Sequence, residues 1–371
     1  MDKNKRLTVW LPVIIAASIA LGIFIGNHYL SISQGKKRSY SSGNKINAIL
    51  DIIDEQYVDT VSMSKLVEST IPKIFSELDP HSVYIPAEDA SVVNEELEGS
   101  FSGIGVSFNM QTDTILVISV ISGGPAEKAG LLPFDRIISI NDSIFSGKKK
   151  NQGEIMKTLR GAKNSTVKLG VQRGNSPELL YFDVTRGDVP VNSVDVSFEA
   201  AKGIGYIKVS KFARNTYNEF ITAIAKLKQA GCTSFVIDLR GNTGGYMDAA
   251  INMINEFMPE GRLIVYTEGK SFPRSDVYAN GTGTCKDAPI VVLTDEISAS
   301  ASEIFSGAIQ DNDRGTIIGR RTYGKGLVQT QMSLSDGSEM RLTIARYYTP
   351  SGRCIQKKYE MGNTDAYDQD I

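Results

Sequence analysis

Apolar residues recur at helical spacing early in the chain and at strand spacing further on. Between residues 45 and 98, positions such as Ile46, Ile49 and Ile53 fall on one helical face, which predicts a helical region. Residues 99–187 instead carry short alternating runs between glycine-rich turns. That pattern predicts a small β-rich module.

The stretch 188–358 mixes apolar runs with amphipathic segments. Gly205–Val209 and Ser234–Leu239 are apolar runs typical of buried strands, and Tyr217–Gln229 between them has helical periodicity. This order predicts parallel strands joined by a crossover helix. The same pattern predicts a further strand, a helix and a two-stranded hairpin, at Ile290–Thr294, Ser300–Gln310, Leu327–Leu334 and Glu339–Tyr347.

The run from Leu7 to Gly26 is uncharged and mostly apolar, and lysines and an arginine stand just before it. Twenty helical residues span ~30 Å, the thickness of a bilayer core. The positive-inside rule then keeps residues 1–6 in the cytoplasm and exports the chain beyond the apolar run. A cleaved signal peptide, with a small-x-small site at Ser18-Ile19-Ala20, and a buried soluble helix are the alternatives. We expect an uncleaved anchor.

Composition narrows the chemistry. The 371 residues have a net charge of −2, with 40 basic and 42 acidic residues, which argues against general nucleic-acid binding. The two histidines, His28 and His81, cannot make a histidine-rich metal site. We therefore expect no metal and no cofactor. The three cysteines are scattered without a CxxC motif, and their odd number excludes a fully paired framework.

A glycine-rich turn opens the β-rich module at Gly103-Ile104-Gly105-Val106. Such a loop exposes backbone N–H groups that can hold a terminal carboxylate, and the strand after it can accept an added peptide strand. The turn alone is weak evidence, because it could be only a turn. With the GPAEKAGL motif at 124–131 and DRIISIN at 135–141, the module resembles a PDZ domain, which implies peptide binding at residues 103–106.

Two loops follow predicted buried strands, where α/β proteins place their sites. The first, 238–245, reads DLRGNTGG. Its glycines allow close backbone approach and leave N–H groups open, as in an oxyanion hole or a phosphate loop, although it lacks the GK[ST] of a Walker motif. A simple tight turn is the alternative.

The second loop, 298–303, reads SASASE and leads into a helix. Ser300 and Glu303 match a capping box, in which the serine only satisfies an N–H group. The same geometry suits a nucleophile, because the helix dipole and the N–H of Ala301 would stabilise an oxyanion.

A serine nucleophile needs a base. His28 belongs to the membrane segment, and His81 stands between turn residues, where a structural role fits better. Lys325 lies between two glycines and is either an exposed turn residue or a buried base. As a base, its pKa must fall well below the ordinary value of about 10.4.

Three motifs together, DLRGNxGG, SASASEI and TYGKGxVQ, resemble the carboxy-terminal processing proteases, also called tail-specific proteases. The resemblance covers residues from ~45 to ~358 and includes LDPHS at 78–82. It implies Ser300 as nucleophile, Lys325 as general base and Gln329 as the residue that orients the lysine. It also implies that Gly245 and Ala301 form the oxyanion hole.

The expected fold is α/β, with a crotonase/ClpP-like βαβ protease core, an inserted β-rich PDZ domain, an N-terminal helical region and one transmembrane helix. The chain ends soon after the core, whereas many relatives continue, so a truncated terminus is one interpretation. The expected parts are 1–30 cytoplasmic tip and anchor, 31–44 linker, 45–98 helical region, 99–187 PDZ domain, 188–358 protease core and 359–371 polar tail.

The resemblance implies a serine endopeptidase anchored in the bacterial inner membrane, with its catalytic part in the periplasm. Expected partners are proteins or peptides with free, apolar carboxyl termini, an adaptor protein and further copies of the chain. An inactive PDZ adaptor of the same fold is the first alternative, but Ser300, Lys325 and Gln329 are all intact. A different acyl-transfer enzyme on a crotonase-like fold is the second, and the PDZ module argues against it.

Overall fold

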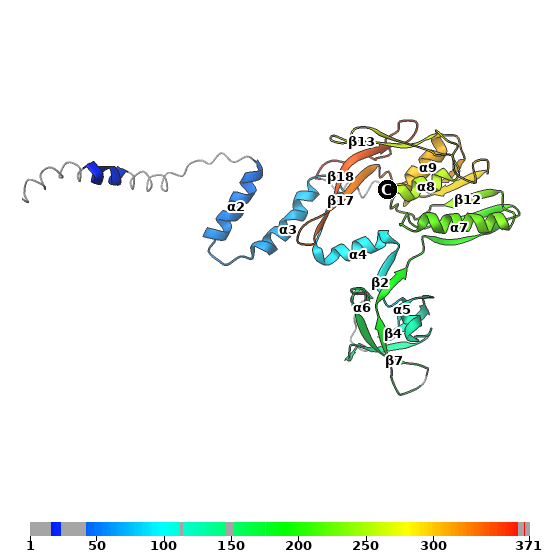
Figure 1. The fold of residues 1–371 in the computed structure, drawn as a ribbon, viewed down its shortest axis with the longest axis horizontal. Helices are drawn as coiled ribbons and strands as arrows, with labels where there is room; N and C mark the ends of the chain where they lie inside the picture. Colours follow the sequence, from blue (N-terminus) through cyan, green and yellow to red (C-terminus); the bar gives the residue numbers. More distant parts are fainter. Residues whose placement is uncertain are drawn as a thin grey trace, which may run out of the picture. The chain divides into compact units, whose positions relative to one another are not determined.

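The structure is a computed structural model that describes residues 16–23, 42–111, 114–145, 152–174, 176–362 and 367. The chain forms two units, Met1–Ser69 and Thr70–Ile371, and the boundary between them falls inside helix α3 (Figure 1). Each unit is described by itself.

The first unit is mostly helical where it is described. Residues 16–23 are helical, α2 spans Ser42–Gln56 and α3 spans Met63–Ser76. Most of the predicted anchor lies outside the described residues, and within the described ranges no helix is long and apolar enough to cross a membrane. The predicted linker also lies mostly outside them, although α2 already begins at Ser42.

The region predicted to be helical, 45–98, also contains a short strand between Pro80 and Pro86, which interrupt the helical pattern. Helix α4 covers Ala87–Glu98, but Val83–Ile85 before it form strand β1, which pairs antiparallel with β18 (Glu339–Tyr348). Three residues are too short for a periodic signal, and the distant partner strand decides their conformation. This pairing brings the LDPHS segment beside a strand that lies more than 250 residues later in the chain.

The β-rich module is built around one antiparallel sheet in the order β3-β4-β5-β7-β8, with β6 paired to β5. Strands β2 and β9 pair antiparallel and join the two ends of the module. Its core holds fully buried Val117, Ile137, Ile155 and Leu169. The elements are β2 Ser100–Gly103, β3 Val106–Gln111, β4 Thr114–Val120, α5 Pro125–Ala129, β5 Arg136–Ile140, β6 Ser143–Ile144, α6 Gln152–Leu159, β7 Thr166–Gln172, β8 Leu180–Thr185 and β9 Gly187–Pro190.

The remaining chain forms two sheets. The first has the order β10-β11-β12-β15-β16, in which β11, β12, β15 and β16 are parallel, as the strand–helix–strand pattern predicts. In the second, the hairpin β17–β18 pairs with β1 and β13 (Figure 1). The elements are β10 Val194–Ala201, β11 Ile204–Val209, α7 Thr216–Gln229, β12 Ser234–Asp238, α8 Met247–Asn255, β13 Leu263–Glu268, β14 Ser275–Tyr278, β15 Ile290–Thr294, α9 Ala301–Asp311, β16 Thr316–Gly319 and β17 Leu327–Ser333.

Four fully or almost fully buried phenylalanines anchor the helices of this part to the sheet. Phe257 makes tilted or edge-on contacts with Phe220, Phe235 and Phe305, at centroid distances of 6.2, 6.3 and 6.4 Å. Burying each ring stabilises the fold by roughly 1.5–3 kcal/mol. Because Phe305 belongs to α9, this cluster fixes the helix at whose start Ser300 stands.

Candidate active site

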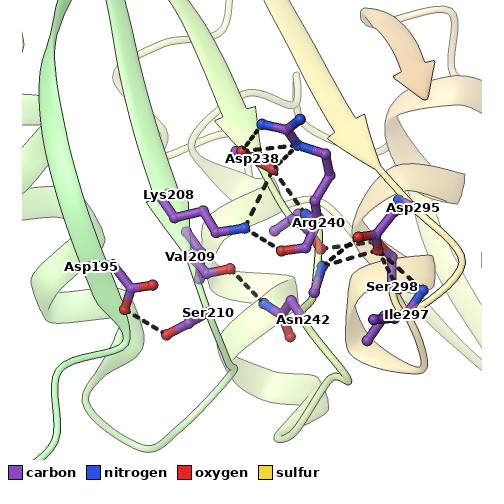
Figure 2. A network of polar contacts seen from close by, with 12 residues as sticks. Asp195, Lys208, Val209, Ser210, Asp238, Arg240, Asn242, Asp295, Ile297 and Ser298 are labelled. Carbon is purple, nitrogen blue, oxygen red and sulfur yellow. Dashed lines mark hydrogen bonds and ion pairs between the residues drawn. The ribbon is translucent and has the colours of Figure 1, made fainter. Parts of the chain in front are cut away.

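The loop after β12 is held by a buried carboxylate. Asp238 is only 1% exposed and accepts hydrogen bonds from the guanidinium of Arg240 (Figure 2). It also accepts a hydrogen bond from the hydroxyl of Tyr206. The ammonium of Lys208 lies 3.6 Å from the Asp238 carboxylate. Burial alone would raise the pKa of Asp238, but these hydrogen bonds outweigh it and lower the pKa to about 2. The Asp238 carboxylate therefore stays ionised at neutral pH and keeps its hydrogen bonds from Arg240 and Tyr206.

The two glycine- and serine-rich loops are joined by hydrogen bonds that the sequence did not predict. The N–H of Gly241 donates to the carboxylate of Asp295 at 3.0 Å, and the Ser298 hydroxyl donates to the Leu239 carbonyl at 2.9 Å (Figure 2). Asn242 accepts from the Ala299 N–H and the Ser302 hydroxyl through its carbonyl oxygen. The only signal in the sequence was that both loops follow buried strands.

Gly244 and Gly245 bring the first loop against Ser300 and Phe212. Their φ angles are +102° and +138°, a range that L side chains rarely adopt. A Cβ added to Gly244 would lie 2.7 Å from the Ser300 Cβ, and one added to Gly245 would lie 2.1 Å from the Phe212 carbonyl oxygen. Only glycine fits at either position.

The N–H groups at this junction are open. Among the described residues, neither the N–H of Gly245 nor that of Ala301 donates a hydrogen bond. The next N–H along the first loop, that of Tyr246, does donate one, to the carbonyl oxygen of Phe212. The Ala301 nitrogen lies 3.0 Å from the Cβ position of Gly244, so the two loops meet here. Two backbone donors at such a junction can receive a developing negative charge.

Ser300 stands directly before α9 in a rare backbone conformation. Its φ is +56° and its ψ is −113°, which is costly for a residue with a Cβ and is found at functional turns. Its N–H donates to Glu303 Oε2 at 2.8 Å, which is the carboxylate half of the capping box. The Glu303 N–H in turn donates to the Ser300 backbone carbonyl at 2.8 Å.

Glu303 connects the serine loop to the lysine loop. It is 1% exposed, and its carboxylate also accepts hydrogen bonds from the N–H groups of Gly324 and Lys325, at 2.7 and 2.8 Å. Burial raises the pKa of Glu303, and the hydrogen bonds that it accepts oppose that rise. The sequence indicated Glu303 only as a cap.

Tyr347 makes a second connection between the same two loops. Its hydroxyl lies 3.1 Å from the Ser300 carbonyl oxygen and also contacts the carbonyl oxygen of Lys325. Complete burial raises the pKa of Tyr347 well above its usual value, so the phenol remains a donor. Glu303 and Tyr347 therefore hold the backbones of Ser300 and Lys325 in fixed relation.

Lys325 is partly buried, and its ammonium donates to Gln329 Oε1 at 3.1 Å. Burial lowers the pKa of Lys325 and the charge of Arg341 lowers it further, while Asp79 and Glu303 oppose the change. The structure thus places Lys325 and Gln329 together, as expected of a lysine and the residue that orients it. The side chains of Ser300 and Lys325 themselves share no hydrogen bond in the described part of the chain.

His81 contacts the site through its backbone. Its carbonyl oxygen accepts a hydrogen bond from the side-chain amide of Gln329, whereas its ring nitrogen Nε2 lies 2.9 Å from the Tyr367 hydroxyl. Within the described ranges, no group of three or more His, Cys, Asp or Glu residues could hold a metal ion. Cys232, Cys285 and Cys354 are unpaired.

The turn predicted to bind a peptide terminus opens the β-rich module. Gly105 has a φ of +78°, and its carbonyl accepts from the Ile121 N–H at 3.0 Å, while the Ile104 carbonyl accepts from Ala126 at 2.7 Å. No described residue accepts a hydrogen bond from the N–H of Ile104 or Gly105. Val106 begins β3, which lies at one edge of its sheet.

A serine with a rare backbone conformation before a helix, a partly buried lysine with a lowered pKa and a β-rich module with an exposed edge strand are the features expected of a PDZ-containing serine peptidase. A model of peptidase family S41 matches residues 203–364, and a PDZ domain model matches 102–196. The chain belongs to the carboxy-terminal processing proteases of family S41.

Two relatives support the assignment of the chain to the carboxy-terminal processing proteases. Carboxy-terminal processing protease CtpB of Bacillus subtilis is 35% identical over 318 residues, which are 85% of this chain and 66% of that protein. A probable CtpA-like serine protease of Staphylococcus aureus is 33% identical over 365 residues, 96% of this chain and 72% of that protein. Among solved structures, the photosystem II D1 C-terminal processing protease is 28% identical, with a TM-score of 0.47 and coverage of 85% of this chain and 91% of that chain.

Proposed function

We propose that the chain is a serine endopeptidase that cleaves proteins near their carboxyl termini by a Ser300–Lys325 dyad. The observation that carries this proposal is the state of Lys325: the amine is partly buried, its pKa is lowered and it donates a hydrogen bond to Gln329. A buried amine that is easily neutralised can act as a general base. The expected relation to Ser300 is supported by the two connections through Glu303 and Tyr347.

In this mechanism neutral Lys325 takes the proton of the Ser300 hydroxyl while Oγ attacks the peptide carbonyl carbon. The N–H groups of Gly245 and Ala301 stabilise the tetrahedral oxyanion. Lys325 then gives its proton to the leaving amine as the C–N bond breaks, which leaves an acyl-enzyme on Ser300. Water attacks the ester with Lys325 again as base, and the acid product leaves.

The Ser300→Ala variant tests the proposal. We expect the full chain to degrade an unfolded protein and the variant to leave it intact, because the nucleophile is lost while the fold is kept. The assay follows fragments by gel and mass spectrometry, and circular dichroism verifies folding. Equal degradation by both proteins would instead favour a contaminant or another nucleophile, and a folded wild type without activity would favour the adaptor alternative.

The PDZ domain is proposed to read the substrate's free carboxyl terminus. The open N–H groups of Ile104 and Gly105 suit a carboxylate, and the edge strand from Val106 suits an added peptide strand. Gly103 ends the strand that leads into this loop.

We therefore expect amidation of an apolar peptide's carboxyl terminus to weaken its binding at least several-fold, because a charge-assisted hydrogen bond becomes a neutral one. Fluorescence anisotropy with matched free-acid and amidated peptides measures this. Equal affinity for the two peptides would remove the carboxylate from the recognition model.

We also propose, from the sequence, that residues 7–26 anchor the chain in the bacterial inner membrane and place the protease in the periplasm. A reporter fused after residue 40 should be active only in its exported form. Cytoplasmic activity of the fusion would contradict this topology. From the resemblance of the motifs alone, we also propose that the core is crotonase/ClpP-like, that an adaptor protein binds the chain and that the chain forms a homo-oligomer.

A further inference from the structure

Asp79 lies in the turn that precedes β1, and its carboxylate is almost fully enclosed, with 8% of the residue exposed. Oδ1 accepts hydrogen bonds from the N–H groups of His81 and Ser82, both at 3.0 Å, and from the Thr343 hydroxyl at 2.9 Å. Oδ2 accepts from the Ser82 hydroxyl at 2.5 Å. One carboxylate therefore folds this turn and attaches it to β18.

The attachment fixes the position of the turn relative to the hairpin that carries Gln329. The Thr343 N–H donates to the Ser82 hydroxyl at 3.0 Å, and β1 continues the contact through the pair Val83 and Arg341. Gln329 itself lies opposite Thr343 in the β17–β18 ladder. The turn and the amide side chain are thus held by the same stretch of β18.

The His81 carbonyl decides which way the Gln329 amide points. An amide carries a donor at one end and an acceptor at the other. Because its Nε2 donates to the His81 carbonyl, its Oε1 faces Lys325, whose amine is a donor. A reversed amide would set two donors against each other. When the Lys325 amine is neutral, the N–H that it donates to Gln329 fixes the rotation of the amine and therefore the direction of its lone pair.

We propose that Asp79 is a positioning residue for the general base: it holds the His81 carbonyl that orients Gln329, which in turn orients Lys325. The inference rests on the proposed function, in which Lys325 is the base. This role explains how the LDPHS motif contributes to the site: His81 supplies its backbone carbonyl, which accepts a hydrogen bond from Gln329, and not its imidazole.

The charge of Asp79 has a separate effect. Among the described residues, three charged groups act on Lys325: Asp79 from the turn and Glu303 from α9 raise its pKa, and Arg341 from β18 lowers it. Geometry and charge can be separated, because Asp79→Asn keeps an acceptor oxygen for the turn but removes the charge, whereas Asp79→Ala removes both.

A double-mutant cycle in the full chain tests whether Asp79 positions Lys325 through Gln329. We expect Asp79→Ala to lower kcat about 10- to 100-fold with little change in KM, since the amine is misplaced while peptide binding is untouched. In a Gln329→Ala background the same change should cost almost nothing more, because the residue through which it acts is already gone. Losses that multiply would show a merely structural role and overturn the inference.

The pH dependence of kcat/KM for Asp79→Asn tests the effect of the charge and can be measured even if the alanine variant does not fold. We expect the rising limb of the profile to move to lower pH, because the removed carboxylate raised the pKa of Lys325. Asp89→Asn, a matched change at an exposed position of α4, should leave the profile in place. An unmoved profile for Asp79→Asn would contradict the effect of the Asp79 charge on Lys325, and a kcat lowered as much as in Asp79→Ala would contradict the positioning role, because asparagine keeps an acceptor oxygen for the turn. An active Lys325→Met variant would instead refute the proposed function itself.

Discussion

Replacing Lys325 by methionine should reduce proteolysis by about 10⁴-fold or more, and replacing it by arginine should do the same. Methionine fills a similar volume without an amine, and a guanidinium cannot lose its proton in the working range. In both variants Ser300 has no base. Because nucleophile and base act as a unit, the Ser300→Ala/Lys325→Met double variant should be no slower than either single variant. Initial rates of cleavage of a fluorogenic peptide measure this.

The wild-type enzyme should gain activity with rising pH through one ionisation below the ordinary range of lysine. The direction follows from the lowered pKa of Lys325: the neutral, basic form becomes populated as pH passes that lowered value. Lys226→Ala, at an exposed position of α7, is the matched control and should retain the wild-type rate and profile. Near-normal cleavage by Lys325→Met would remove the lysine from the mechanism.

Substituting Gly245 by alanine should lower kcat about 10²- to 10³-fold, the usual cost of losing one oxyanion donor. The new Cβ would lie 2.1 Å from the Phe212 carbonyl oxygen, so the loop must shift away from Ser300. The backbone at φ +138° adds strain of about 1–3 kcal/mol. Kinetics and thermal unfolding should therefore both change.

A Gly231→Ala control separates the clash of the new Cβ from the backbone strain of an alanine at positive φ. Gly231 also has a positive φ, +92°, but a Cβ there would meet nothing within 4 Å. We expect this control to lose some stability and keep its kcat. If Gly245→Ala also keeps its kcat, the close approach at Phe212 does not position an oxyanion donor.

The sequence predicted the elements with strong periodicity and the residues in recognisable motifs. The parallel strands β11, β12 and β15, helix α7 and the β17–β18 hairpin lie within a few residues of the expected ranges. Periodicity reports burial on one face, which is a local property. The contact of Lys325 with Gln329 could likewise be expected, because only four residues separate them.

Contacts between distant segments could not be predicted in the same way. Strand β1 is too short to carry a pattern, and Glu303, Tyr347 and Asp79 act by accepting or donating hydrogen bonds across long stretches of chain. A buried glutamate or tyrosine gives no periodic signal of its partner. Sequence motifs thus gave the candidate reacting groups, Ser300 and Lys325, while the groups that connect their loops appeared only in the fold.

Trapping of the acyl-enzyme tests the central claim most directly. The full chain is mixed with an activated peptide ester, quenched with acid within one turnover, digested and analysed by mass spectrometry. We predict one acyl group on the peptide that contains Ser300, absent in Ser300→Ala and formed far more slowly in Lys325→Met. An acyl group on another residue, or product formation without any acylated Ser300, would contradict the account.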